Sequence, residues 1–236
     1  MKGFIIGLLL LLCNGGLAAA DSFPPPFTAN YKIYAKGFPA GNGTRTLTQL
    51  SNGNFLFKTT AKTSGFISLF KNLQIEEQSR FIQKRGKIRP LQYIYRQTGK
   101  KTRLNKVIFD WANRQANSIF KEQSKKVVLR EGMLDRLLYQ VVLMQDLQQG
   151  KRQLSYTVVT KGKIVIYAPK LLGTDRVETG VGNLKTLKYT RRSSNNKRHT
   201  TLWCAPSLHY LPVMIEHVET NGDVFKMVLQ SVKGLK

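Results

Sequence analysis

Residues 44–63 of the chain, TRTLTQL-SNGN-FLFKTTAKT, decide the fold class. Residues 44–50 and 55–63 alternate in polarity, which is the period of a β-strand that buries one face. Between them lies Asn52-Gly53, the dipeptide that most strongly favours a tight hairpin turn. This stretch therefore predicts an antiparallel β-hairpin.

Similar short segments, bounded by turn residues, follow one another along the chain. Further strands are predicted at residues 31–35, 73–83, 91–97, 102–111, 117–120, 126–129, 153–160, 163–167, 175–179, 184–190, 200–205, 211–219 and 224–232. Residues 41–43 (Gly-Asn-Gly) predict a turn, residues 65–71 a helical turn or packed loop, and residues 191–198 an exposed basic loop.

Residues 131–149 have a different period. Their apolar positions recur every three or four residues, which places them on one broad face of a helix. These positions are Met133, Leu134, Leu137, Leu138, Val141, Val142, Met144 and Leu147. Asp135 near the start and Gly150 after the end agree with helix-capping trends. The sequence therefore predicts a mainly β fold: a strongly curved antiparallel sheet or open barrel with one substantial amphipathic helix at about 131–149.

The first 20 residues have the composition of a cleavable export signal. Lys2 supplies positive charge, residues 4–12 form a short apolar run, and residues 18–20 are three alanines. We expect cleavage after Ala20. The alternative is a membrane anchor, but a spanning helix needs about 20 apolar residues, about twice the length of this run.

The two cysteines bear on the compartment. Cys13 would be the modified residue of a lipoprotein, but the leucines at 10–12 precede it where a small residue is expected. Once Cys13 is removed with the signal, Cys204 has no partner for an internal disulfide. The apolar surroundings of Cys204 favour a small buried hydrophobic residue over a nucleophile.

These features predict three segments. Residues 1–20 are the signal peptide, residues 21–28 a proline-rich extended leader, and residues 29–236 a single β-rich domain. The expected location is the periplasm. We expect that the protein is not an integral membrane protein, because no later stretch is long and apolar enough to span a membrane.

The net charge is +25, from 38 Lys and Arg against 13 Asp and Glu, and it becomes +24 when Lys2 is removed. A field of this sign attracts nucleic acid, anionic phospholipid or the phosphates of lipopolysaccharide. Export removes nucleic acid from the expected partners and leaves anionic lipid, lipopolysaccharide or an envelope protein. The alternative is a solvated basic surface, because the basic residues are spread along the chain.

No stretch carries a recognisable catalytic, metal or cofactor motif. The three histidines lack zinc-site spacing, and neither a nucleophile elbow nor a glycine-rich phosphate loop is present. Glu76 and Glu77 are adjacent, so on a strand they point to opposite faces and cannot act as an acid/base pair. We expect a protein that is not an enzyme and has no cofactor. The residues that an unrecognised hydrolase would use are Cys204, His209, Asp110 and Glu178.

The aromatic residues fall mostly on predicted strands. Most are expected to fill the core, but a curved sheet capped by a helix often leaves an apolar cavity for a lipophilic ligand. The candidate lining residues are Tyr93, Tyr95, Phe109, Leu137, Leu138, Val141, Tyr167, Trp203 and Met214.

The C-terminal motifs resemble a known family. TTLWCAP at 200–206, YLPVMIE at 210–216 and Asn221-Gly222 are similar to the closing motif of domain-of-unknown-function family 3108, a family of exported bacterial proteins. Segments similar to earlier parts of that family lie at 31–41, 65–71, 89–95, 107–110, 134–140 and 180–189. The resemblance covers nearly all of residues 29–235. It implies export, one domain and a β-rich fold, and it supplies no catalytic residues.

Three functions are consistent with these features. The first is binding of a lipophilic or anionic envelope component by a periplasmic protein. The second is a role in envelope assembly or protein interaction, through an exposed strand edge or a basic surface. The third is the unrecognised hydrolase.

Overall fold

The computed structural model describes residues 22–64, 72–84, 86–99, 101–193 and 197–235. The predicted signal peptide, Cys13 and the predicted loop at 65–71 lie outside these residues. No helix in the described ranges has the length and apolar character needed to cross a bilayer.

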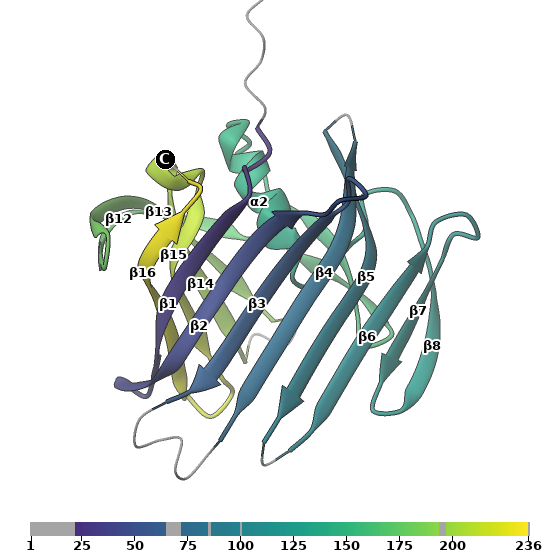
Figure 1. Cartoon of the computed structure of the whole chain (residues 1–236), viewed down its shortest axis with the longest axis horizontal. Coiled ribbons are helices and arrows are strands. Elements are labelled where there is room, and N and C mark those ends of the chain that lie inside the picture. Colours follow the sequence, from purple (N-terminus) through teal and green to yellow (C-terminus); the bar gives the residue numbers. More distant parts are fainter. Residues whose placement is uncertain (1–21, 65–71, 85, 100, 194–196, 236) are drawn as a thin grey trace, which may run out of the picture.

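Two sheets make up most of the described chain (Figure 1). The large sheet contains β1 (Phe27–Ala35), β2 (Phe38–Gln49), β3 (Phe55–Thr63), β4 (Gln74–Lys84), β5 (Lys87–Thr98), β6 (Arg103–Asp110), β7 (Gln115–Phe120), β8 (Gln123–Val128), β12 (Lys170–Thr179), β13 (Gly182–Arg192), β14 (His199–Ala205), β15 (Leu211–Val218) and β16 (Val224–Lys233). The small sheet contains β9 (Leu134–Asp135), β10 (Tyr156–Thr160) and β11 (Lys163–Tyr167). A short 3-10 helix, η1 (Pro206–Leu208), joins β14 to β15.

The large sheet is curled but not closed into a barrel. Its strand order is β12-β13-β14-β15-β16-β1-β2-β3-β4-β5-β6-β7-β8, so β12 and β8 are its two edges. Figure 1 shows β1 to β8 as one wall, with α2 (Tyr139–Gln148) behind it and β12 to β16 at one side. This confirms the predicted class, a strongly curved antiparallel sheet with one helix.

Alternating burial shows which face of the sheet lines the core. On β3, Phe55, Phe57 and Thr59 are buried, while the residues between them are partly exposed. Phe55 stacks on Phe81 of β4 with ring centroids 5.6 Å apart. A half-buried antiparallel sheet shows this period of two, so the pattern predicted at 44–63 reflects the inner wall of the curl.

The turn predicted at Asn52-Gly53 is present, and the turn predicted at residues 41–43 is not. Asn52-Gly53 closes the β2–β3 hairpin, where the Gly53 N–H donates to the Leu50 carbonyl at 2.9 Å. Residues 41–43, predicted as a turn, instead lie within β2. A Cβ at Gly41 would stand 2.2 Å from the Lys62 carbonyl oxygen. Glycine is therefore required there by a close approach of two backbones.

The helix is shorter than predicted and is not amphipathic. It spans Tyr139–Gln148 instead of 131–149, and seven of its residues, from both sides, are buried. Upstream, Leu134–Asp135 forms β9, which pairs in parallel with Val158–Val159 of β10. The apolar residues of 131–138 recur every three or four positions although they are not helical. Their side chains are buried because a short strand and a turn lie inside the curled sheet.

The predicted extended leader packs on the core. Phe23 is buried, with its ring centroid 5.0 Å from that of Phe55 and 6.3 Å from that of Phe81. β1 then starts at Phe27, four residues before the predicted strand. The leader therefore covers the end of the core where β3 and β4 meet.

The β12–β13 hairpin folds against the outside of the sheet. At its tip the Gly180 N–H donates to the Leu229 carbonyl of β16 at 2.9 Å. A Cβ at Gly180 would lie 2.3 Å from the Gln230 carbonyl oxygen, so the contact is between backbones. Trp203 lies under this hairpin, and its indole N–H donates to Asp175 at 3.1 Å.

We expect Phe23→Ala to lower the free energy of unfolding by about 3 kcal/mol, because it removes a buried aromatic ring from the packed cluster. Urea denaturation of the two proteins would measure the difference. Phe38→Ala is the control, since Phe38 is 72% exposed. Equal losses in the two variants would contradict the packing assigned to the leader.

Candidate functional site

A row of polar side chains crosses the inner face of the sheet. Arg45, Thr59, Glu77, Tyr95 and Asn105 are successive cross-strand partners on β2 to β6. Buried atoms of Arg45, Thr59 and Asn105 have no hydrogen-bond partner among the described residues. Polar groups at inward positions of a sheet are unusual, because burial without a partner is unfavourable. The interior of the curled sheet is therefore not purely apolar.

Glu77 is the acidic centre of this row. It accepts a 2.6 Å hydrogen bond from the Tyr93 hydroxyl and forms an ion pair with Arg136 at 3.1 Å. The Arg136 guanidinium also lies 5.6 Å from the centre of the Tyr95 ring. Glu76 instead pairs with Lys58 at 3.0 Å. The two adjacent glutamates thus point to opposite faces, as predicted.

Asp135 ties the segment before the helix to the sheet. Its carboxylate accepts hydrogen bonds from the Ser79 hydroxyl at 2.5 Å and from the backbone N–H groups of Leu137 and Leu138 at 2.9 and 2.8 Å. The side chain is fully buried, and burial raises its pKa to about 7 even though these hydrogen bonds oppose the shift. Asp135 therefore positions α2 and titrates near neutral pH.

Cations gather where the small sheet meets the large one. The Lys161 ammonium lies 4.9 Å from the centre of the Phe120 ring. Partial desolvation lowers the pKa of Lys161, and repulsion from nearby cations lowers it further. These cations are Arg136, Arg198, Arg103 and Lys121. A lysine in such surroundings would be stabilised by an anion.

Beside Lys161 is a cavity of about 310 Å³, which we call the lysine pocket. It is lined by Ser118, Phe120, Gln123, Lys125, Lys161, Gly162 and Lys163. The tip of the β10–β11 hairpin forms one wall, held by a 2.8 Å hydrogen bond from the Gly162 N–H to the Ser118 hydroxyl. Three lysines and an aromatic ring line the pocket, and its lining includes no carboxylate.

The nine predicted cavity residues do not form one lining. Tyr93, Phe109, Leu137, Leu138, Val141 and Trp203 are buried, and Tyr95, Tyr167 and Met214 are partly buried. Trp203 and Met214 are cross-strand partners. Trp203 follows the inward-facing Leu202 on β14, so its side chain points to the opposite face of the sheet. They lie on the outer side with Asp175, away from the other seven. None of the nine lines the lysine pocket. A ligand cavity between sheet and helix stays a prediction.

Three of the four candidate hydrolase residues, Cys204, Asp110 and Glu178, are buried or hydrogen-bonded within the fold, and the buried Nδ1 of His209 has no hydrogen-bond partner among the described residues. Cys204 is completely buried, and burial raises the pKa of its thiol to about 12. Such a thiol is a poor nucleophile at neutral pH. Asp110 accepts hydrogen bonds from Asn113 in the turn after β6, and Glu178 accepts one from Asn183. Among the described residues, no group of three or more His, Cys, Asp or Glu could hold a metal ion.

Sequence reasoning missed the lysine pocket. Lys161-Gly162 lies between the strands predicted at 153–160 and 163–167, but nothing local to it shows that this turn docks on β7 and β8. Lys125 and Lys163 are 38 residues apart in a chain whose basic residues are spread along its length. The useful signal was the turn itself, because a hairpin tip with Lys on both sides of Gly concentrates charge.

We expect the Asp135→Asn variant to remove a pH dependence of stability. The folded-state pKa is raised to about 7 from an ordinary value of 3.8. The folded protein therefore holds a proton that the unfolded chain has released, so stability is greatest at low pH and falls as pH rises from about 4 to 7. The fall is at most about 1.4 kcal/mol per pH unit.

Urea denaturation across this pH range would compare the wild type with Asp135→Asn, whose amide can still accept from the backbone and donate to Ser79. Asp110→Asn is the control, since hydrogen bonds lower the pKa of this exposed carboxyl. The same slope in wild type and Asp135→Asn would show that Asp135 is ionised in the folded protein throughout.

Comparison with known proteins supports the fold. A β-barrel-like protein of domain of unknown function DUF1849 from Brucella abortus matches 90% of this chain and 99% of its own, with 8% identity and a TM-score of 0.57. A putative lipoprotein from Parabacteroides distasonis matches 90% of this chain and 98% of its own, with 11% identity, but its TM-score of 0.34 supports no conclusion. No curated protein matches the sequence.

The sequence also matches a family model. The match covers residues 30–230, nearly the whole span of the curled sheet and its helix. It confirms the resemblance found in the motifs near the C-terminus and in the helix segment. The chain belongs to the family described as "Protein of unknown function (DUF3108)".

Proposed function

We propose that this is a non-enzymatic periplasmic protein that binds an anionic component of the cell envelope in the lysine pocket. The observation that carries the proposal is the composition of the pocket. Lys125, Lys161 and Lys163 converge on one cavity beside Phe120, and the lining includes no acidic side chain. Converging cations with one aromatic wall suit a phosphate or carboxylate attached to a larger molecule.

Electrostatics favours an anion at this place over other parts of the basic surface. Some surface cations of the described chain are paired with carboxylates, for example Lys58 with Glu76 and Lys151 with Asp146. Lys161 instead faces other cations, and its lowered pKa reflects the cost of charging it there. An anion in the pocket would remove that cost, because opposite charges at short range favour each other's ionised forms.

The proposed ligand follows from compartment and size. The export signal predicted at residues 1–20 would bring the protein to a space bounded by anionic lipid surfaces. A cavity of about 310 Å³ suits a headgroup, and the phosphates of phospholipid and of lipopolysaccharide share the chemistry required. An acyl chain between the sheet and α2 is less favoured, since buried side chains of the core surround that helix.

We expect the triple variant Lys125→Gln, Lys161→Gln and Lys163→Gln to bind vesicles that contain phosphatidylglycerol about 100-fold more weakly than the wild type. Each lysine near an anionic surface contributes about 1 kcal/mol, and glutamine keeps the aliphatic part of the side chain. Co-sedimentation with vesicles of phosphatidylglycerol and phosphatidylethanolamine at low salt would measure the change. A second arm with lipopolysaccharide distinguishes the source of the phosphate.

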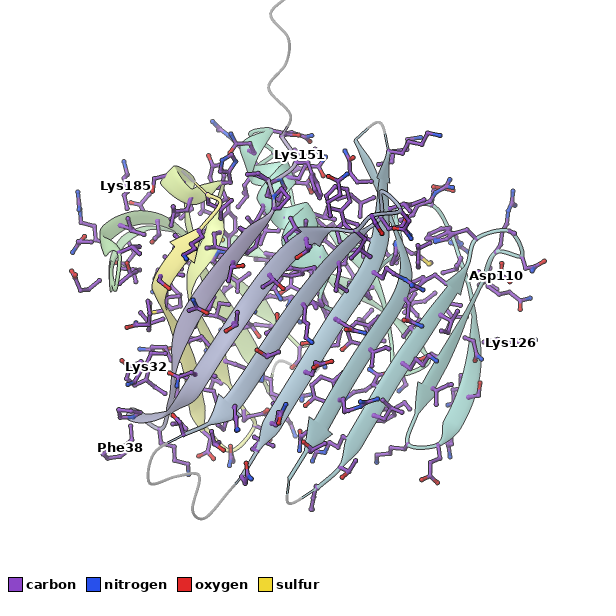
Figure 2. The ribbon with its side chains drawn as sticks, in the orientation of Figure 1. Lys32, Phe38, Asp110, Lys126, Lys151 and Lys185 are labelled. Carbon is purple, nitrogen blue, oxygen red and sulfur yellow. The ribbon has the colours of Figure 1, made fainter. Side chains whose placement is uncertain are left out.

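The control removes the same charge elsewhere, through Lys32→Gln, Lys62→Gln and Lys185→Gln on β1, β3 and β13. Figure 2 shows Lys32 and Lys185 on the side of the molecule opposite Lys126 of β8. We expect this variant to lose much less affinity. Equal losses in the two triple variants would mean that only the overall charge matters and that the lysine pocket is not a site.

A further inference from the structure

The last strand of the large sheet, β8, has a free edge. A two-residue turn, Lys121-Glu122, joins β7 to β8. In such a hairpin the pair next to the turn, Phe120–Gln123, exchanges two backbone hydrogen bonds. Along the two strands, every second cross-strand pair of residues is hydrogen-bonded in the same way. The 2.8 Å hydrogen bond from the Leu129 N–H to the Arg114 carbonyl agrees with this alternation of bonded and non-bonded pairs. Lys126 belongs to the other set, so its N–H and C=O point away from β7.

Val128 belongs to the same outward set as Lys126, because it lies two positions further along the same strand. The sheet order ends at β8, so within the described chain no strand pairs with these groups. Figure 2 shows Lys126 at the outer margin of the sheet. An edge of this kind accepts another extended segment.

A groove of about 380 Å³ lies beside this edge. It is lined by Val128, Arg130, Glu131, Met133, Thr157, Ile164 and Ile166, and we call it the edge groove. Val128, Ile164 and Ile166 are 67%, 47% and 59% exposed. Ile164 and Ile166 alternate along β11, so their side chains share one face of the small sheet. Three exposed aliphatic side chains thus gather next to free backbone hydrogen-bonding groups.

The charge around the edge groove is positive. Lys126 and Arg130 lie along the same segment as Val128. The acidic residue of the lining, Glu131, is already bound by Arg89, with a nitrogen–oxygen distance of 2.6 Å. An occupant would therefore meet positive charge beside an apolar surface.

We propose that an extended segment of an acidic partner protein adds to β8 as a further strand and places alternate apolar side chains in the edge groove. Backbone hydrogen bonds to Lys126 and Val128 would hold the segment, and its apolar side chains would cover Ile164 and Ile166. Its acidic side chains would lie near Lys126 and Arg130. This site is separate from the lysine pocket and does not depend on the function proposed for it.

A second copy of this chain fits the edge less well. Pairing two β8 strands would bring Lys125 and Lys126 of one copy against those of the other, and each copy carries a large positive charge. Lysines on an edge strand are a common means of preventing such pairing. The same lysines favour an acidic strand from a different protein.

The test uses the purified protein and a synthetic octapeptide that alternates valine and glutamate, with a valine–lysine octapeptide as its charge control. We expect the valine–glutamate peptide to bind and the valine–lysine peptide to bind at least roughly tenfold more weakly. On binding, hydrogen exchange at the Lys126 and Val128 amides should slow. The Lys125 and Val127 amides should change little, because they are already bonded to β7.

Two variants locate the site. Ile164→Thr with Ile166→Thr removes apolar surface but keeps β-branched side chains, and it should weaken peptide binding roughly tenfold. Leu171→Thr with Leu172→Thr is the matched control on the other edge strand, β12, where these leucines are 55% and 58% exposed. Binding by that control should match the wild type.

Several results would overturn the proposal. One is the absence of peptide binding, and another is equal binding of the two peptides. If the double isoleucine variant and the double leucine variant lose the same peptide affinity, the effect comes from general surface hydrophobicity. Binding of neutral phosphatidylcholine vesicles that is lost only with the isoleucine variant would assign the groove to a membrane. Concentration-dependent dimerisation lost with that variant would assign it to a second copy.

Discussion

A curled sheet needs something to fill its concave face, and this requirement organises the whole molecule. The inward aromatic residues of β3 and β4 cannot be buried by the sheet alone. The segment from β9 through α2 to β11 enters the curl and fills it, which explains why α2 is buried on both sides and not only along one stripe. Asp135 anchors this segment to β4 through Ser79 and starts the turn before the helix.

The same arrangement explains the polar groups in the interior. A segment that enters a curled sheet brings hydrogen-bond donors and acceptors with it, and these need partners on the sheet. Arg45 therefore donates to Gln140 of α2 at 2.8 Å, and Glu77 binds Arg136 just before the helix. Burial of such groups favours one arrangement over others, because an alternative packing would leave charges unpaired. The raised pKa of Asp135 follows from the same burial.

Both proposed sites arise where the inserted segment meets the edge of the sheet. The β10–β11 hairpin docks its tip on β7 and β8 through Gly162 and Ser118, which brings lysines from two hairpins together. It does not pair with β8, so the strand edge and the face of β11 stay available. A closed barrel would have removed that edge. Incomplete closure thus produces a cationic pocket and an apolar groove along one strand.

The sequence by itself determined the strands, most turns, the family and the inward or outward parity of neighbours such as Glu76 and Glu77, because these depend on local period and turn chemistry. It placed a helix near residue 140 but overestimated its length, since buried apolar residues in a strand and turn imitate a helical stripe. Tertiary structure alone decided that residues 41–43 continue a strand and that Trp203 lies outside the curl. It also brought Lys125 and Lys163 together. Docking of segments distant in the chain produces these features, and no local pattern encodes it.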